Sequence, residues 1–529
     1  MTDSGMMCLR NVMRSEVMER FLKRHASRVL GSISGFDRLL FRGVLRSISY
    51  VQGLDWFMGS QRVGFKDFQW FVEKFSAGIK KRAEQIAQRA GRPFQFVPSG
   101  KTNKEALVRK LLEEKPVKEG LICVLSCVEP CVTFTVRRDR EKRQLRLLPR
   151  DATCLHFYFY FLDRDVGLMH IRLQSWLPLA IQVCVNGREW LARQMQREGI
   201  AFAQKDNCFT QIADLERAQA LMDRLVNLPW APILNRWAQA VNPWLAAGAR
   251  PRLRRYYWTV RQGEYASDVM FRSPQALAEV YPALCRHAVE QFSSPQVLRF
   301  LGRRTNTLFN GEVCSTQERR IEGVCVKHRV EENSIKMYDK HGSVLRVETT
   351  RNHPQRFRVY RRVRRRGRTV KGWYPLRKGI VDLRRRVELS RGANVRYLEA
   401  LAVVGESQPA HRILDPVSQP VKTPRPYRAL RPISPQESCL FAAVLRGEFH
   451  LQGVRNRDLR EALCPSPPND SAQRRRAAAH TTRQLRLLRA HGLIYRVRRT
   501  HSYRPTQKGQ LIMNTALKFR QTDFALLAT

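Results

Sequence analysis

Alternating ionisable and aromatic side chains between residues 336 and 348 are the part of the sequence best suited to chemistry. Lys336, Tyr338 and Lys340 share one parity, and Arg346 and Glu348 share one parity after a short turn. Because side chains alternate between the two faces of a strand, the pattern predicts a basic and aromatic sheet face with one carboxylate. A tyrosine beside cations could attack a phosphodiester if a carboxylate held a metal ion nearby. Tyr338 and Glu348 are therefore the candidate catalytic residues; the alternative is a face that packs, or contacts phosphate through Lys336 and Lys340.

Other carboxylates could hold magnesium for phosphodiester cleavage or strand transfer, although no spacing among them is diagnostic. Asp163 and Asp165 fall in a predicted turn, where aspartate usually serves local hydrogen bonds. Mg²⁺ is therefore expected only if the protein is an enzyme, which the sequence leaves open, and no other cofactor is indicated. The acids considered are Asp163, Asp165, Glu189, Glu264, Asp268, Glu312 and Glu348.

A group of cysteines with one histidine invites a zinc interpretation. Zinc ligands usually come in pairs two to four residues apart inside a turn. Cys123 and Cys127 instead fall in a strand-like run on the same parity, where buried cysteines act as small hydrophobic side chains. Core packing is the prediction and no metal site is assigned, with zinc and redox chemistry as alternatives for Cys123, Cys127, Cys131, Cys154 and His156.

The last seventy or so residues predict a short helix, a long arginine-rich helix and a hairpin. Asn456–Leu463 is followed by a turn at Cys464–Asp470 and by Ala472–His491, in which Leu485 and Leu488 recur at helical spacing. One stripe of the long helix should therefore pack inward and leave the polar stripe for solvent or nucleic acid. The candidate contacts are Arg475, Arg476, Thr482, Arg483 and Arg486 on the helix and Arg496, Arg498, Arg499 and Arg504 on the hairpin.

In this order the elements resemble the winged helix-turn-helix of MarR-type regulators, over Ser434–Phe519. The resemblance implies that the second helix enters the major groove of duplex DNA while the wing touches the backbone. The chain as a whole resembles a group of uncharacterised bacterial proteins often labelled MarR-like, which brings no catalytic residue and no substrate. The residues that prompt this are Ser34-Gly35-Phe36-Asp37-Arg38, Asn186–Gln194, Asn333–Thr350 and Asn456–Leu459.

The segment from Lys336 to Glu348 also resembles rolling-circle replication initiators of the filamentous-phage and plasmid type. That resemblance implies a DNA-nicking tyrosine, here Tyr338. The sequence departs from it because the His-hydrophobe-His pair of such enzymes is missing, and only His170-Ile171-Arg172 and His156 stand in its place.

Composition points to a polyanionic partner. The chain has 529 residues, with 95 Lys and Arg against 46 acids, a net charge of +49 and a pI near 10.9. Nucleic acid is the natural counterpart of such a charge, and duplex DNA is favoured over RNA only by the C-terminal elements. A membrane is not expected, because apolar runs are short, and Met1–Arg14 has no apolar core of a secretion signal. Twelve scattered cysteines fit a reducing compartment, so a cytoplasmic location is predicted.

A further basic stretch, Arg351–Arg391, contains Asp382 and Glu388 as its acids. Its arginine-rich arm should contact phosphate without reading sequence. The arm residues proposed for this contact are Arg361, Arg364, Arg365 and Arg366.

Periodicity predicts an α+β, multidomain protein. Helices are expected at Glu16–Leu30, Phe65–Ala90, Arg188–Glu198, Ile212–Val226, Pro229–Arg254 and Ser273–Phe292, and strands at Leu121–Val136, Gln144–Leu148, Leu155–Leu162, Gly167–Trp176, Ile321–Val330, Ser334–Lys340 and Ser343–Thr350. The expected regions are a helical N-terminal region (1–115), a mixed α+β body (116–310), a basic β-meander with the arginine-rich arm (311–407), a proline-rich linker (408–434) and a winged-helix domain (435–529).

The sequence thus predicts a protein that binds duplex DNA at a defined site and is associated with a mobile element or plasmid. Three alternatives stay open: a winged-helix transcriptional regulator, a DNA-nicking replication initiator or transposase, and a protein that binds structured RNA. Charge alone does not separate DNA from RNA, because phosphate neutralisation is blind to the sugar. The oligomeric state is not predicted.

Overall fold

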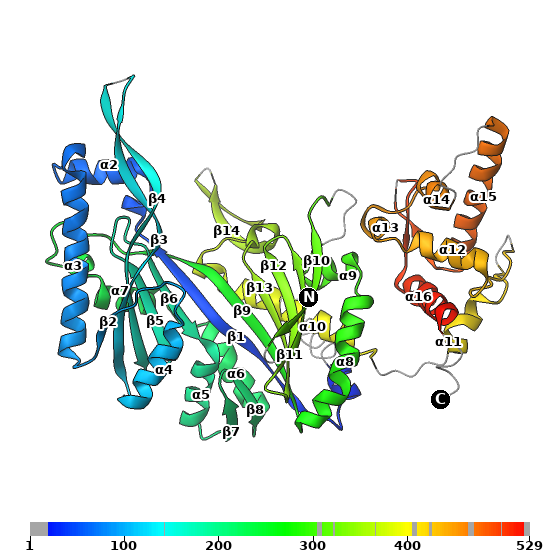
Figure 1. Ribbon diagram of the computed structural model, residues 1–529, viewed down its shortest axis with the longest axis horizontal. Helices are drawn as coiled ribbons and strands as arrows, with labels where there is room; N and C mark the ends of the chain where they lie inside the picture. The colour runs from blue at the N-terminus through cyan, green and yellow to red at the C-terminus, as the bar shows by residue number, and fades with distance from the viewer. Residues whose placement is uncertain are drawn as a thin grey trace. The chain divides into compact units, whose positions relative to one another are not determined.

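The computed structural model describes residues 19–522, apart from short gaps at 142, 304–308, 321–322, 366, 405–409, 423–425, 464–469 and 499. Met1–Arg14, on which the expectation about secretion depends, lies outside these residues, as does most of the turn predicted at Cys464–Asp470. The chain divides into two compact units, one comprising residues 1–279, 318–327 and 332–398 and the other residues 280–317, 328–331 and 399–529. The structure contains both helices and strands, and its large sheet is mainly antiparallel, which is consistent with an α+β fold (Figure 1).

A large sheet organises the first part of the chain. It has eleven strands in the order β10-β11-β12-β13-β9-β1-β6-β5-β4-β3-β2, and all the pairings in its central part are antiparallel. The bounds are β1 (Val29–Val44), β2 (Phe94–Phe96), β3 (Gly120–Asp139), β4 (Gln144–Asp163), β5 (Gly167–Gln174), β6 (Ile181–Asn186), β9 (Tyr257–Phe271), β10 (Val313–Arg320), β11 (Gly323–Val330), β12 (Asn333–Lys340) and β13 (Val344–Arg351).

The long strand β1 corrects the expectation of a mainly helical N-terminal region. Residues 19–24 are helical, but the predicted helix Glu16–Leu30 then gives way to β1, which lies beside β9 in Figure 1. Ile33, Leu39 and Phe41 are completely buried, and β1 pairs with β6 on one side and β9 on the other. A strand that is buried on both faces lacks clean alternation, so its apolar run could not be told from a helix by periodicity.

Helices cover the sheet of the first unit and supply much of its core. The predicted helix Phe65–Ala90 is confirmed as α3, in which Phe71, Phe75 and Ile79 recur at helical spacing and are buried. The helices of this unit include α2 (Val51–Ser60), α3 (Phe68–Arg89), α4 (Lys104–Glu114), α5 (Gly187–Arg197), α6 (Leu215–Val226), α7 (Trp230–Val241) and α10 (Leu383–Leu401). A small separate sheet pairs β7 (Phe202–Lys205) with β8 (Cys208–Ile212).

The predicted meander is confirmed as β11, β12 and β13, but the basic stretch that follows is more ordered than expected. It forms an antiparallel hairpin of β14 (Arg358–Arg365) and β15 (Arg368–Pro375), and then α10. Arginines stand at both odd and even positions of β14, so the alternation of apolar and polar residues on which strand prediction depends is not visible in its sequence.

In the second unit, a long helix matches the arginine-rich helix predicted at Ala472–His491, and it is followed by the predicted hairpin. Leu414, Val417 and Leu430 belong to the same core as this helix, so parts of the predicted linker pack against the C-terminal elements. The elements towards the C-terminus are α8 (Pro274–Glu290), α9 (Ser294–Phe300), α11 (Ala410–Leu414), α12 (Pro435–Val444), α13 (Gly447–Gln452), α14 (Asn456–Leu463), α15 (Ser471–Ala490), β16 (Ile494–Arg496), β17 (Tyr503–Pro505) and α16 (Gln507–Gln521).

One glycine permits the close approach between α5 and β1. Asn186 caps α5 by accepting hydrogen bonds from the amides of Arg188 and Glu189. A methyl group on Gly187, the first residue of the helix, would lie 2.0 Å from the carbonyl oxygen of Phe36. Real side chains do not approach backbone this closely, so only glycine lets the helix begin here.

We predict that Gly187→Ala lowers the free energy of unfolding of the first unit by about 1–3 kcal/mol, the usual cost of overpacking. Thermal unfolding followed by circular dichroism measures this. Gly59→Ala is the matched control, because a methyl group there meets nothing within 4 Å, and it should be neutral or slightly stabilising. Equal melting temperatures for the two variants would contradict the close contact.

Candidate nucleic-acid interface and buried carboxylate cluster

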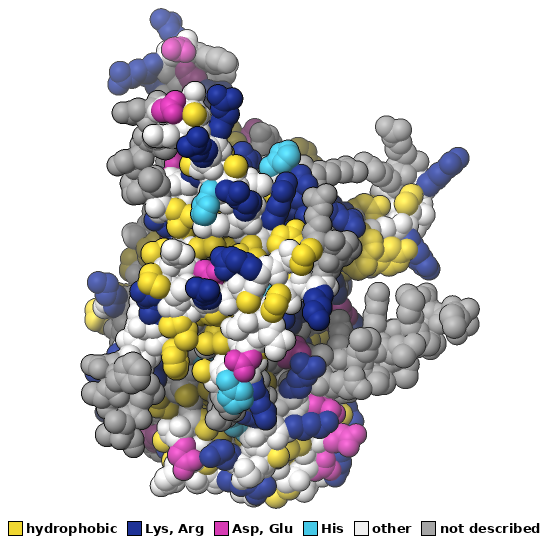
Figure 2. All heavy atoms as spheres, turned by 90° about the vertical axis from the view of Figure 1, so that its right-hand side faces the viewer, with side chains coloured by type: hydrophobic (Ala, Val, Ile, Leu, Met, Phe, Trp, Pro, Cys, Tyr) yellow, Lys and Arg dark blue, Asp and Glu magenta, His cyan; other side chains and the backbone are white. Residues whose placement is uncertain are grey.

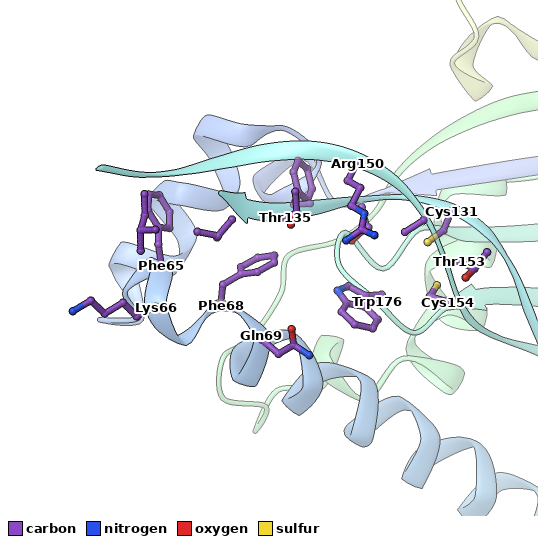
Figure 3. Close-up of a pocket in the computed structure, with 15 residues that line it drawn as sticks. Phe65, Lys66, Phe68, Gln69, Cys131, Thr135, Arg150, Thr153, Cys154 and Trp176 are labelled. Atoms are coloured by element: carbon purple, nitrogen blue, oxygen red, sulfur yellow. The ribbon is translucent and has the colours of Figure 1, made fainter. Parts of the chain in front are cut away.

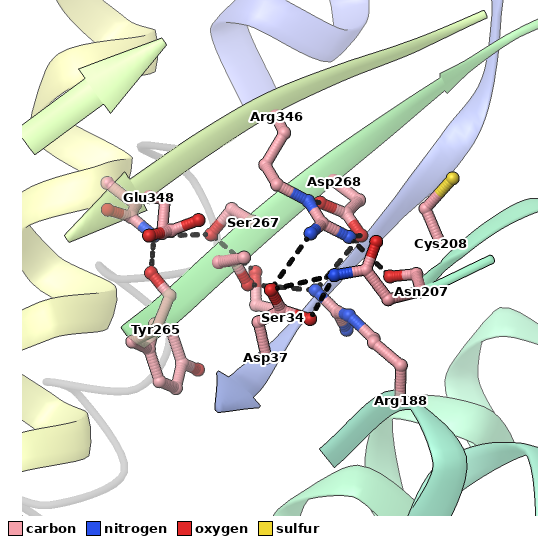
Figure 4. A network of polar contacts seen from close by, with 12 residues as sticks. Ser34, Asp37, Arg188, Asn207, Cys208, Tyr265, Ser267, Asp268, Arg346 and Glu348 are labelled. Carbon is pink, nitrogen blue, oxygen red and sulfur yellow. Dashed lines mark hydrogen bonds and ion pairs between the residues drawn. The ribbon is translucent and has the colours of Figure 1, made fainter. Parts of the chain in front are cut away.

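A fully buried arginine links three neighbouring strands of the large sheet (Figure 4). Arg346 of β13 contacts Asp268 of β9, with Nε 2.7 Å from Oδ1 and Nη2 2.9 Å from Oδ2. Its Nη1 lies 3.2 Å from Oδ2 of Asp37 in β1, and Nη2 also donates to the carbonyl of Asn207 at 2.7 Å. A buried guanidinium keeps its proton, so its position depends on these carboxylates.

A second buried cation completes this ion network. Arg188, at the start of α5, places Nη2 3.0 Å from Oδ2 of Asp268, and both side chains are completely buried. Burial alone would raise the pKa of Asp268, but the charges of Arg188 and Arg346 outweigh it and lower that pKa. Asp268 is therefore held ionised between two arginines.

Three carboxylates meet beside this network. Atoms of Asp37, Glu264 and Glu348 that could ligate a metal all lie within 4.8 Å of one another. Their strands β1, β9 and β13 are neighbours in the sheet, and the β1–β9 register shifts between Phe36 and Arg38. A bulge of this kind re-aims side chains, and here it occurs at Asp37. Oxygen ligands this close together suit a hard divalent cation such as Mg²⁺.

The face predicted from strand parity is confirmed around Glu348. Lys336 pairs with Glu348 in the β12–β13 register, and its Nζ lies 2.9 Å from Oε1. The Tyr338 hydroxyl donates to Oε2 of Glu348 at 2.9 Å. Burial, and then the charge of Glu348, raise the pKa of Tyr338. This geometry disfavours a Tyr338 nucleophile, because the phenol is a donor whose anion would be destabilised.

Glu264 of the cluster has a raised pKa. Burial and the neighbouring Glu348 raise the pKa of Glu264 above its ordinary value. Gln262 donates to its Oε1 at 2.7 Å. A cation bound between Glu264 and Glu348 would remove their mutual repulsion and displace the proton.

A groove of about 1030 Å³ lies next to the cluster, and its lining includes residues that hold the carboxylates. Asn207 donates to both oxygens of Asp37 at 3.0 Å, and Gln262 donates to Glu264. The cations of the lining are Arg38, Arg109, Arg172, Arg261 and Lys340.

Glu129, one of the acids that line the groove, is neutralised by its own contacts. Glu129 accepts hydrogen bonds from Tyr158, Lys104 and Arg172 at 2.7–2.9 Å. Burial would raise the pKa of Glu129, but these bonds outweigh it and lower the pKa to about 2. At this point the groove presents cations and the aromatic Tyr158, whereas Glu105, Glu189 and Asp206 line it elsewhere.

Another cavity, of about 780 Å³, lies between the start of α3 and the β3–β4 pair and has a mainly neutral lining (Figure 3). Cys131 and Cys154 line it. Cys123 and Cys127 are in a small hydrophobic cluster, which confirms core packing for these two residues. Among the residues that the structure describes, the only group of three potential metal ligands is the carboxylate cluster.

The remaining candidate acids lie apart from the cluster. Asp163 accepts hydrogen bonds from the amides of Asp165 and Val166, as expected for a turn between β4 and β5. Glu312 pairs with Arg329 at 3.3 Å. Asp268 and Glu264 are thus the two predicted acids that the fold brings to the region of Glu348.

The arginine-rich helix α15 exposes the predicted polar stripe, with Leu485 and Leu488 buried beneath it. Thr482 is half-buried, and its hydroxyl binds the carbonyl of Ala478 and accepts from Asn456 of α14. Blue Lys and Arg side chains spread over much of the face drawn in Figure 2. The exposed candidates are Arg475, Arg476, Arg483, Arg486, Arg496 and Arg498, while Arg499 lies outside the described residues.

Arg504 and Arg361, two of the residues predicted to contact nucleic acid, are bonded to groups within the protein instead. Arg504 is only 6% exposed and donates to the carbonyl of Leu451, so it is not on the surface of the hairpin. Arg361 pairs with Asp382 at 3.0 Å, and both are shielded. Arg364 is exposed, whereas Arg366 and the side chain of Arg365 lie outside the described residues.

Comparisons with protein-family models, with curated proteins and with solved structures find no match for this chain. None of the helices that the structure describes is both long and apolar enough to cross a membrane. Asp37 was not among the acids considered for chemistry, because it stands in an apolar run and far in sequence from its partners. Its neighbours Phe36 and Arg38 are not metal ligands, so no ligand spacing marks Asp37 and only the fold reveals its place in the cluster.

Replacing Arg346, which Asp37 and Asp268 share, should destabilise the folded protein. We predict that Arg346→Met lowers the free energy of unfolding by about 3–5 kcal/mol, because it leaves Asp37 and Asp268 short of a cation. The lowered pKa of Asp268 should then rise towards its ordinary value, because one of the two arginines that hold it down is lost. The loss of stability relative to the wild type should therefore be larger at about pH 7 than at about pH 3, where the carboxylate takes up a proton.

Urea unfolding at both pH values measures this effect. Arg197→Met is the control, because Arg197 forms an exposed pair with Asp165 at 2.8 Å and should cost less than about 1 kcal/mol. A loss of stability for Arg346→Met that matches the control would contradict a structural role for the network.

Proposed function

We propose that the protein binds duplex DNA through its C-terminal elements, acting as a winged helix. The observation that carries this proposal is α15, a long helix whose exposed stripe is arginine-rich and whose opposite stripe, with Leu485 and Leu488, is buried. Such a helix can enter a major groove while its apolar side stays anchored to the unit.

The order and contacts of neighbouring elements support this assignment. The helices α12, α13, α14 and α15 precede the β16–β17 hairpin in the described part of this unit, and α16 follows it. Asn456 of α14 donates to the carbonyl of Ala478 and to Thr482, which fixes α14 against α15. This order and packing support our proposal that the C-terminal elements act as a winged helix of the MarR type that the sequence resembles.

The hairpin would act as the wing. Arg496 and Arg498 are exposed and available for phosphate, whereas the buried Arg504 anchors β17 by its bond to Leu451. Arginine suits both tasks, because its guanidinium binds phosphate or guanine edges with paired hydrogen bonds. The wing contact would therefore add affinity rather than sequence preference.

Duplex DNA at a defined site is compatible with an element-borne or plasmid protein and with a transcriptional regulator. Structured RNA is the remaining binding alternative. The high net charge is compatible with both duplex DNA and structured RNA, and only the proposed helix-and-wing arrangement favours duplex DNA.

We predict that Arg483→Ala combined with Arg486→Ala weakens specific DNA binding by about 1–3 kcal/mol for each base that is no longer read, with a smaller effect on random duplex. Sites are first selected from a random duplex library, and affinities then come from gel shifts. Arg446→Ala is the control, because Arg446 is exposed in the same unit but lies outside α15 and the hairpin. Equal weakening on specific and random duplex would contradict base reading.

A second candidate function is metal-assisted phosphodiester chemistry in the first unit. It is favoured by the three carboxylates within 4.8 Å of one another beside a groove whose lining includes five Lys and Arg side chains along with four acids. Asp37, Glu264 and Glu348 would hold Mg²⁺, which lowers the pKa of bound water so that the water can attack phosphorus and break the P–O bond. Lys336 would stabilise the negative charge that develops on the phosphate.

We predict that Mn²⁺ binds the protein and that Asp37→Asn with Glu264→Gln weakens this binding at least tenfold. Because the pKa of Glu264 is raised, a proton competes with the metal, so affinity should increase as pH rises through that pKa. Calorimetry with Mn²⁺ measures binding, and labelled DNA with Mg²⁺ or Mn²⁺ reports cleavage. Asp163→Asn, in the β4–β5 turn, is the control.

Tyr338→Phe separates the two candidate nucleophiles. A water nucleophile predicts that cleavage persists in Tyr338→Phe without any covalent protein–DNA adduct. An adduct that forms in the wild type and disappears in this variant would instead establish the nicking tyrosine. Metal binding that is unchanged in the carboxylate variant would reject the cluster as a metal site.

A further inference from the structure

One face of the β14–β15 hairpin consists of exposed cations around two exposed aromatic rings. Tyr360 and Trp373 are cross-strand partners in the hairpin register. Because side chains alternate along each strand, they share a face with the exposed cations at alternate positions. We call this set the basic-aromatic face: Arg358, Tyr360, Arg362, Arg364, Lys371 and Trp373, all exposed.

The aromatic pair is unusual for a protein surface. Tyr360 is 57% exposed and Trp373 is 54% exposed, and their ring centroids lie 5.5 Å apart. Aromatic rings of this size are normally buried, since each covers a large apolar area. Neither ring is needed to close a core here, so the pair offers flat π surfaces to a ligand.

Charge complementarity identifies the kind of ligand. The sequence from Arg358 to Pro375 contains no Asp or Glu, so the cations of the face have no acid within the hairpin. The nearby acid Asp382 is engaged with Arg361, which lies on the opposite parity of β14. A polyanion with flat apolar rings is the partner that satisfies both the charges and the exposed aromatics.

The base of the hairpin is anchored, so the rings are presented on a defined support. The amide of Leu376 donates to the carbonyl of Phe357 at 2.8 Å, which closes the base of the hairpin. Arg385 of α10 donates to the carbonyl of Arg358, and its guanidinium lies 5.7 Å from the Trp373 ring centroid. The hairpin is thus held against α10 at its base.

We propose that the basic-aromatic face binds single-stranded nucleic acid, with unpaired bases stacked on Tyr360 and Trp373 and phosphates on the surrounding cations. A base pair within a duplex has its π faces covered by neighbouring pairs, so only unpaired bases can use these rings. This contact is distinct from the duplex contact proposed for α15 and does not depend on it. It would suit DNA-processing or regulatory steps that open a duplex next to the bound site.

The test uses the full chain and four fluorescent probes of about 20 nucleotides, longer than the sites that such platforms usually cover. The probes are single-stranded DNA, single-stranded RNA, an abasic sugar–phosphate strand and a blunt duplex. Fluorescence anisotropy should show that Tyr360→Ala with Trp373→Ala weakens binding to single-stranded DNA or RNA roughly 10- to 100-fold. Binding to the abasic strand and to the duplex should stay within about twofold.

Three controls keep the result interpretable. Trp56→Ala removes a tryptophan that is 72% exposed on α2 and should leave all probes unaffected. Tyr360→Phe with Trp373→Phe keeps both rings and should retain most of the single-strand affinity. Arg362→Ala with Lys371→Ala should flatten the dependence of log affinity on log salt for single strands by roughly 0.7 for each phosphate that is no longer neutralised, on the abasic probe too.

Equal weakening on the abasic and base-containing strands would overturn the stacking proposal, as would unchanged binding of every probe. Weaker binding to anionic lipid vesicles without any effect on the oligonucleotides would identify a membrane surface and reject it as well. If Arg483→Ala with Arg486→Ala weakens duplex binding and leaves single-strand binding intact, the result bears on the duplex contact of α15 and supports a separate single-strand surface. The two proposals can therefore fail separately.

Discussion

The arrangement of the first unit depends on the ion pairs of the buried Arg346 with Asp268 and Asp37. A buried guanidinium must be matched by carboxylates, and Arg346 is matched by Asp268 and Asp37 from two further strands. Asp268 in turn takes a second cation, Arg188, which α5 can supply only because Gly187 lets the helix begin against β1. The same bonds hold Asp37 beside Glu264 and Glu348. The carboxylate cluster is thus a consequence of how the buried charges are balanced.

The buried cations Arg188 and Arg346 are balanced by acids, whereas much of the excess positive charge lies on exposed side chains. Within the groove lining, Glu129 is neutralised by three donors, and around the cluster Lys336 and Arg346 offset the acids. The Lys and Arg side chains on α15 and on the basic-aromatic face of the β14–β15 hairpin are instead exposed. These two surfaces, one on a helix and one on a strand pair, are therefore the contacts that we propose for a polyanion.

Sequence reasoning succeeded where a single periodicity governs a segment. Parity alone placed Lys336, Tyr338 and Glu348 on one face, and helical spacing identified Leu485 as core. It failed for β1, because a strand buried on both faces lacks alternation, and for Arg504, because a three-residue strand gives no parity signal for which arginine turns inward. Asp37 joins its partners only through strand pairing that spans hundreds of residues, which no local pattern encodes.

Ultraviolet crosslinking followed by mass spectrometry tests the central claim, that two separate surfaces contact nucleic acid, most directly. Photoreactive bases in duplex DNA should crosslink to peptides of α15, and the same bases in single strands should crosslink to peptides that contain Tyr360 or Trp373. Crosslinks scattered over the chain for both probes, or absent from both surfaces, would contradict the account.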